Sequence, residues 1–459
     1  MSNIKLATII SEMLEHNATK SSPLAYAIVH DLVHTILFGF INNRVPSYAG
    51  NLDLAGDSLD FSLQLNTKHE SELRVVFLCQ NSTRTNYLYP MLHALVESNE
   101  YRQAIDISIE IIFFTQAISD IHVNNIKNFI TADSKNVTVS QTSFSYIMSK
   151  WIPNELYIDT LFQEVERIVK LDGIYKFSEH EIQDSVESVV SSYFAFQQFY
   201  SNKCVNIVYA TNDQWYPMSS AFSASVSKGI KTVLSYHGTV AKFATFTYAD
   251  IFYIYSQNKE INFGTRFVNG NVRVFEKPLD IFIFEVCHPE TSALKKLMDA
   301  KPRRGSTIGI VSAISGDKTY SLNDYSNSLL LILRGISFFF ASHPDRNDIS
   351  IKILPHPSDS KDKYDSVYKE IIKKSTIDDD KINILYGVEL FDFFSSCGPI
   401  IGCPSTGLDT LLYYGYPIKI VASNNLFENV FGYNPYAESV ICKDEKELVI
   451  FLEKFLIGQ

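Results

Sequence analysis

The chain has 459 residues, of which 46% are hydrophobic and 20% charged, and its formal net charge at pH 7 is −11. This length exceeds one ordinary hydrophobic core, so we expect two domains of comparable size. The negative charge argues against nucleic acid as a general partner, because proteins that bind nucleic acid present a basic surface. The six cysteines form neither a zinc nor a redox motif. With no signal-peptide pattern at the start, we expect a cytoplasmic protein.

Residues 1–65 are expected to form a helical N-terminal extension. Its most apolar segment, residues 24–41, contains two histidines and an aspartate. These polar side chains argue against a transmembrane span and favour a buried or amphipathic helix. Peripheral contact with the inner face of the plasma membrane stays open, although no strongly basic amphipathic helix supports it.

Residues 66–300 alternate between β-type and helical patterns. We expect strands at the short apolar runs 73–78, 107–114, 137–139, 205–210, 231–235, 251–255 and 272–275. Apolar positions at helical spacing predict helices over 87–98, 153–200 and 219–228. The βαβαβ order predicts a Rossmann-like acceptor domain with helices on both faces of a sheet.

Residues 301–443 repeat this alternation and predict a second Rossmann-like domain, which would hold a nucleotide donor. Its expected strands are 307–311 and 349–354 and two runs that begin near residues 382 and 400, with helices over 326–342 and 363–374. Residues 444–459 form a last amphipathic helix. The fold class is therefore α/β, with two Rossmann-like domains that face a ligand-binding cleft.

The strand predicted at 349–354 ends in Pro355-His356-Pro357. The two prolines stiffen the backbone and keep it out of a helix. An imidazole at the carboxyl end of a strand can donate a hydrogen bond to a phosphate oxygen or a ribosyl hydroxyl. The alternative is a turn that only needs prolines. Two other His-Pro pairs occur in the chain, but neither follows a predicted strand.

Ser405-Thr406-Gly407 lies between an apolar run and a helical pattern that begins at Leu408. A hydroxyl pair at a helix N-terminus suits an anion, because the first backbone N–H groups and the helix dipole both favour negative charge. The alternative is a serine that only caps the helix. Combined with His356, the motif predicts a site for a nucleotide-activated donor.

His237-Gly238-Thr239 follows the strand predicted at 231–235. Gly238 allows close approach of the backbone, and His237 is a candidate general base or phosphate ligand. A loop histidine beside a turn glycine explains the motif equally well. Asp213, just past the strand predicted at 205–210, is the alternative base, although most aspartates in such places only form turns.

Four further residues are weaker candidates. Asn81 and Arg84 follow the first predicted strand and would contact the acceptor, unless this loop is only a solvated connection. Gly316 and Glu389 would line the donor site, although an acidic residue near a helix start needs no ligand. No P-loop, zinc-binding or nucleophile-elbow motif is found, so no metal is expected.

Residues 307–417 resemble bacterial GT-B glycosyltransferases that build surface polysaccharides. His356-Pro357 and Ser405-Thr406 are similar to motifs that hold CMP and its phosphate in sialyltransferase-like and Kdo-transferase-like members. His237-Gly238-Thr239 is similar to a motif of CDP-glycerol glycerophosphotransferases, in which the histidine is a candidate base. The chain lacks the acidic pair followed by glycine that some bacterial sialyltransferases use. It also has Cys403-Pro404 where the glycerophosphotransferases have an acidic residue.

The resemblance implies a metal-independent glycosyltransferase with no cofactor besides its nucleotide-sugar co-substrate. A CMP-linked acidic sugar is favoured as donor, and a lipid-linked or oligosaccharide acceptor of capsule or lipopolysaccharide type as partner. The expected donor contacts are His356, Pro357, Ser405, Thr406, Gly407, Gly238, Thr239, Gly316 and Glu389. His237 or Asp213 would activate the acceptor. The alternatives are a CDP-glycerol-type glycerophosphotransferase and a non-catalytic GT-B-like scaffold.

Overall fold

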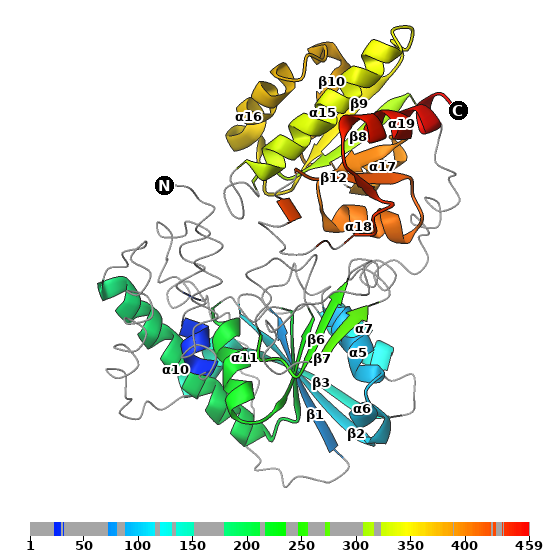
Figure 1. Ribbon diagram of the computed structural model, residues 1–459. Helices are drawn as coiled ribbons and strands as arrows, with labels where there is room; N and C mark the ends of the chain where they lie inside the picture. Colours follow the sequence, from blue (N-terminus) through cyan, green and yellow to red (C-terminus); the bar gives the residue numbers. More distant parts are fainter. Residues whose placement is uncertain are drawn as a thin grey trace.

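The computed structural model contains two parallel β-sheets, one from each half of the chain (Figure 1). The residues that it describes are 23–28, 31, 72–79, 88–114, 120–130, 135–150, 179–211, 216–235, 247–255, 271–275, 306–315, 323–388, 390–423, 426–427, 434 and 436–458. Of the expected N-terminal extension, only residues 23–28 and 31 belong to this set. Among the described residues, no helix is both long and apolar enough to cross a membrane.

The first sheet has seven strands in the order β3-β2-β1-β4-β5-β6-β7, all parallel to their neighbours. This is the doubly wound Rossmann order with one strand added at the edge. The seven expected strands are confirmed, and β3 is longer than predicted because its polar positions lie at a sheet edge. The bounds are β1 Glu72–Cys79, β2 Asp106–Phe113, β3 Asn136–Ser143, β4 Ile207–Ala210, β5 Lys231–Ser235, β6 Ile251–Tyr255 and β7 Asn271–Phe275.

Helices cover both faces of the first sheet. Its central strands carry apolar side chains on both faces, so each face needs a layer of helices to bury it. Val76 and Leu78 of β1 pack with α8, α10 and α11, whereas Val75 and Phe77 pack with α5, α6 and α7. The sequence patterns did not predict α6, α7 or α8. The bounds are α5 Leu88–Val96, α6 Asn99–Gln103, α7 Asp120–Ile130, α8 Phe144–Lys150, α10 Glu179–Lys203 and α11 Met218–Ser227.

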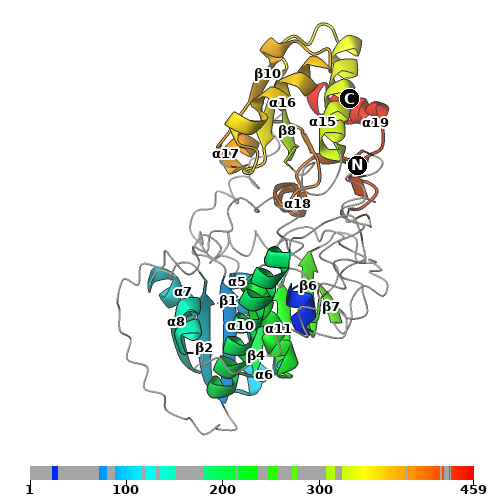
Figure 2. The ribbon, with the colours of Figure 1, turned by 90° about the vertical axis from the view of Figure 1, so that its left-hand side faces the viewer.

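The described N-terminal segment belongs to the core of this first half. Residues 23–28 are helical, and Tyr26 is fully buried. Its ring meets that of Tyr248 edge to face, with the centroids 5.1 Å apart. The segment lies beside α11 in both views (Figures 1 and 2).

The second sheet has six strands in the order β10-β9-β8-β11-β12-β13, again all parallel. In local numbering this is the 3-2-1-4-5-6 order of the Rossmann fold. The expected α/β class with two Rossmann-like units is therefore confirmed. The strand bounds are β8 Thr307–Ser312, β9 Ser350–Pro355, β10 Ile382–Ile384, β11 Ile400–Gly402, β12 Ile418–Val421 and β13 Ile441–Cys442.

The helices of the second unit also cover both faces of their sheet. Helices α15, α16 and α19 share one core cluster with β8 and β9, and α17 and α18 share another with β11. The C-terminal helix α19 packs along α15, where Gly335 leaves room for Leu448. The bounds are α15 Asp324–Ser342, α16 Lys361–Lys373, α17 Leu390–Ser395, α18 Thr406–Tyr413 and α19 Glu445–Leu456.

Candidate functional site

Strands β8, β9 and β11 end level with one another at one edge of the second sheet. Pro355 pairs with Ser312, and Gly402 pairs with Val311. The order of the strands reverses between β8 and β11, and open α/β sheets bind ligands at such a switch point. The interstrand spacing places the ends of β9 and β11 about 10 Å apart, on either side of β8. The structure thus brings the His356 loop and the start of α18 to the same edge. This edge lies on the side of the second unit that faces the first in both views (Figures 1 and 2).

His356 is exposed and follows directly on β9. Its backbone N–H donates to the Ser312 carbonyl oxygen at 2.8 Å, which extends the sheet by one bond. The Ser358 N–H donates to His356 Nδ1 at 3.2 Å, and the Ser358 hydroxyl lies 2.6 Å from the same nitrogen. Desolvation by the surrounding protein lowers the pKa of His356, and the negative charge of Asp359 opposes this effect. A neutral imidazole is therefore the form that the site favours at pH 7.

Asp359 is a buried carboxylate that joins the loops after β8 and β9. Its oxygens accept hydrogen bonds from the backbone N–H groups of Ile314 and Ser315, each at 2.9 Å. The Tyr368 hydroxyl of α16 donates to the same carboxylate at 2.7 Å. Burial raises the pKa of Tyr368, and the Asp359 charge adds to this shift, so the phenol stays a donor. Asp359 was not among the site residues predicted from the sequence. Its position four residues after the end of a strand could have indicated it.

The start of α18 confirms that Ser405 is a helix cap. Ser405 has extended backbone angles, φ −159° and ψ 152°, and its hydroxyl accepts from the Leu408 N–H at 3.4 Å. The N–H groups of Thr406 and Gly407 lie in the first turn, where no intrahelical partner exists. Ser405 and Gly407 are half-buried, so part of this turn faces solvent. An anion could accept hydrogen bonds from these N–H groups.

Close packing at two glycines fixes the position of α18. A Cβ atom on Gly402 would lie 2.7 Å from both the Val311 carbonyl oxygen and Leu408 Cδ1. A Cβ atom on Gly407 would lie 3.0 Å from Leu390 Cδ2. Gly407 was expected to contact the donor, and its contact with α17 is an additional reason for a glycine at this position.

A second buried polar contact braces the same edge of the sheet. The Ser423 hydroxyl, beyond β12, donates to Asp324 Oδ1 at 3.2 Å, and the Ser423 N–H donates to Ser328 Oγ at 2.8 Å. Asp324 and Ser328 belong to α15. The contact holds the first turn of α15 against the end of β12, and nothing in the local sequence pattern predicted it.

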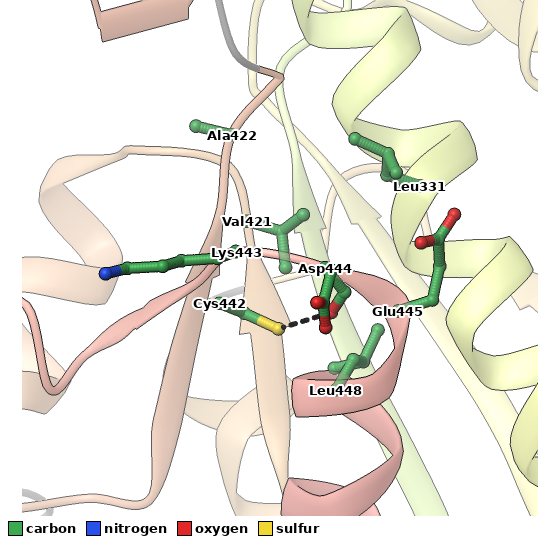
Figure 3. Close-up of a pocket in the computed structure, with 8 residues that line it drawn as sticks. All are labelled: Leu331, Val421, Ala422, Cys442, Lys443, Asp444, Glu445 and Leu448. Atoms are coloured by element: carbon green, nitrogen blue, oxygen red, sulfur yellow. Dashed lines mark hydrogen bonds between the residues drawn. The ribbon is translucent and has the colours of Figure 1, made fainter.

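A small cavity lies beyond the ends of β12 and β13 (Figure 3). Its volume of about 10 Å³ is room for one water molecule at most. The Cys442 thiol points toward Asp444 and donates to its carbonyl oxygen at 3.2 Å. Burial raises the pKa of Cys442 to about 11, so the thiol is unreactive at neutral pH. The lining residues are Leu331, Val421, Ala422, Cys442, Lys443, Asp444, Glu445 and Leu448. This cavity is too small for a nucleotide.

The other candidate residues lie outside the described part of the chain: His237, Gly238, Thr239, Asp213, Asn81, Arg84, Gly316 and Glu389. The strands that precede the candidates of the first half are β1, β4 and β5. These three strands are parallel neighbours, so their carboxyl ends share one edge of the first sheet. The roles of these residues stay predictions.

No protein-family model matches the sequence, and no curated protein was found to be similar. Among solved structures, the chain is similar to MurG of Acinetobacter baumannii, with 9% identity over 83% of this chain and 84% of that one and a TM-score of 0.34. Anabaena HepE in complex with UDP and glucose gives 12% identity, 83% and 89% coverage and a TM-score of 0.38. The α,α-trehalose 6-phosphate synthase of Burkholderia multivorans has 12% identity over 84% of this chain and 91% of that one, with a TM-score of 0.40. The fold assignment rests on the strand order of the two sheets.

Proposed function

We propose that the chain is a GT-B glycosyltransferase that takes a sugar from a nucleotide donor, with a CMP-linked acidic sugar favoured. The observation that carries the proposal is the presence of His356 and the start of α18 on either side of the switch point of the second sheet. A nucleotide phosphate placed there would accept hydrogen bonds from His356 Nε2 and from the first N–H groups of α18.

These groups would act on the leaving nucleotide. When the glycosidic bond to the donor breaks, negative charge develops on the phosphate. Preorganised hydrogen-bond donors stabilise such charge in the transition state. The α18 dipole adds to this stabilisation. We propose that these donors replace a metal ion in the reaction.

We propose that the first unit supplies the acceptor side. His237, or alternatively Asp213, would take the proton of the attacking hydroxyl, and Asn81 and Arg84 would hold the acceptor. The adjacency of β1, β4 and β5 supports this division, since the loops that carry these residues leave from neighbouring strand ends. The acceptor would be a lipid-linked or oligosaccharide precursor of a surface glycan, met at the inner face of the plasma membrane.

The donor site is tested by titrating CMP, CDP, UDP, GDP and ADP into the full chain by calorimetry. Selective binding of CMP is expected. His356→Ala should weaken it about tenfold or more, because a hydrogen bond to a charged group contributes roughly 1.5–3 kcal/mol. Ser360→Ala is the matched control: Ser360 is exposed, and its side chain makes no capping hydrogen bond.

Each other outcome of the titration points to a different conclusion. A preference for CDP would favour the glycerophosphotransferase, and UDP or GDP would keep the site and change the donor. Silence from all five nucleotides would favour the scaffold. Donor turnover that survives both His356→Ala and Ser405→Ala would overturn the assignment of the site.

Catalysis by the first unit is tested with His237→Ala and Asp213→Asn. The variant that removes the base should lower kcat about a hundredfold or more, which is the usual contribution of general base catalysis. Nucleotide affinity should stay unchanged, since the proposal gives both residues the role of a base for the acceptor and no contact with the nucleotide. A variant that loses both turnover and nucleotide binding would contradict the division of roles.

A further inference from the structure

Three side chains at the ends of β8 and β9 form a hydrogen-bonded chain that no sequence motif indicated. Ser315 Oγ lies 2.6 Å from Ser358 Oγ, and Ser358 Oγ lies 2.6 Å from His356 Nδ1. Ser358 is exposed and Ser315 half-buried, so the chain runs along the surface of the proposed nucleotide site.

The direction of each hydrogen bond in this chain follows from one backbone contact. The Ser358 N–H can only donate, so His356 Nδ1 is its acceptor and carries no proton. The Ser358 hydroxyl must then donate to the same nitrogen and accept from Ser315. The proton of the neutral imidazole is therefore on Nε2, which has no hydrogen-bond partner among the described residues. Nε2 is thus available to donate to a ligand.

Asp359 holds the other end of the chain in place. Asp359 is only 2% exposed, and its carboxylate accepts hydrogen bonds from the N–H groups of Ile314 and Ser315. These bonds fix the backbone that carries the Ser315 hydroxyl. Its own N–H donates to the His356 carbonyl oxygen at 2.7 Å. Asp359 therefore makes hydrogen bonds to the backbone at both ends of the Ser315–Ser358–His356 hydrogen-bonded chain. It is also the charged group whose field reaches the His356 ring.

We propose that Asp359 is a positioning residue for nucleotide phosphate, acting through Ser315 and Ser358 to present His356 Nε2–H as a hydrogen-bond donor. The identity of the ligand rests on the proposed function, whereas the tautomer of His356 does not. Asp359 touches no ligand itself. Its effect on binding must therefore pass through His356.

The tautomer is tested without any nucleotide, by two-bond ¹H–¹⁵N correlation spectra of the full chain labelled with ¹⁵N-histidine. His356→Gln identifies the signal by its disappearance. The wild type should show the Nε2–H tautomer. Ser358→Ala keeps the backbone N–H donor, so it should keep this tautomer but shift the Nδ1 resonance, because Nδ1 loses the hydroxyl as a second hydrogen-bond donor. Ser360→Ala should leave the signal unchanged. An Nδ1 resonance that does not move in Ser358→Ala, or a ring that carries its proton on Nδ1 in the wild type, would overturn the proposal.

The coupling is tested by a double-mutant cycle on CMP binding, or on whichever nucleotide binds. Asp359→Asn presents an amide N–H to one of the two backbone donors, so it should weaken binding about tenfold in the wild type. In the His356→Ala background, Asp359→Asn should weaken CMP binding further by less than about twofold, because the residue through which Asp359 acts is absent. Equal weakening in both backgrounds would overturn the proposal.

If thermal unfolding shows that Asp359→Asn is not folded, Ser358→Ala takes its place in the cycle. The Ser358 hydroxyl is exposed, so its loss should not disturb the core. If no nucleotide binds, the proposed function fails. The tautomer measurement then still decides whether Ser358 holds His356 with its proton on Nε2.

Discussion

Helices α11 and α18 occupy equivalent places in the two units but begin in different ways. Each follows the fourth strand of its unit, β4 or β11, which lies beside the first strand of the same sheet. Helix α11 begins after Pro217 without a side-chain cap, and Ser219 and Ser220 in its first turn are fully buried. Helix α18 begins at a half-buried Ser405 that caps it. One topology therefore provides two switch points, and among the described residues the start of α18 is more exposed than that of α11.

The strands that precede these two helices differ in their last residue. Ala210 ends β4 and pairs with Leu78, whereas Gly402 ends β11 and pairs with Val311. The missing side chain at Gly402 lets Leu408 of α18 approach the sheet. The second unit thus positions its helix by close backbone packing.

The largest expected effect on stability is that of Gly402→Ala. The new Cβ would lie 2.7 Å from a backbone carbonyl oxygen, and that oxygen cannot move without breaking the sheet. We expect a loss of about 2–3 kcal/mol, as for other overpacked cores. The matched change in the first unit, Ala210→Gly, should cost about 1 kcal/mol through backbone freedom.

Urea unfolding separates the two units, because both tryptophans, Trp151 and Trp215, lie in the first half of the chain. Gly402→Ala should shift the circular dichroism transition and leave the tryptophan fluorescence transition in place. Ala210→Gly should shift the fluorescence. Coincident shifts of both signals in both variants would contradict independent packing of the units.

A smaller effect is expected from serines in the two helix starts. Ser405→Ala removes a capping hydrogen bond and should destabilise the second unit by about 1 kcal/mol. The Ser220 hydroxyl is buried and has no hydrogen-bond partner among the described residues, so Ser220→Ala should be neutral or stabilising. Chemical denaturation of the two variants checks the contrast. If Ser220→Ala lowers the stability, the Ser220 hydroxyl makes a stabilising polar contact at the start of α11, which would contradict this contrast.

The smallest effect concerns pH. The folded-state pKa of His356 lies below its ordinary value of 6.5, so the unfolded chain takes up this proton first as the pH falls. The stability that this pKa difference gives is present above the unfolded pKa, near 6.5, and is lost as the pH falls from there through the folded pKa. The Tm of the second unit should therefore decline less over this interval in His356→Gln than in the wild type. Parallel declines would contradict the depressed pKa.

Local sequence patterns were sufficient for most strands of this fold. The apolar runs at β5 and β6 are bounded by polar or turn residues, and both strands have the predicted bounds. Helices α6 and α8 are short and bury few side chains, so their periodicity is weak. Helix α7 could have been found, since Val123, Ile126 and Ile130 recur at helical spacing.

In the candidate site, neighbouring residues in the chain were enough to predict His356 at a strand end and Ser405 at a helix start. The tertiary structure brings these two motifs to one edge of the sheet, since their proximity follows from the order of β9, β8 and β11. It also decided the role of Asp359, whose partners Ile314 and Ser315 lie about 45 residues away in sequence. Hydrogen bonds between distant segments depend on how the strands align, and no local pattern carries that information.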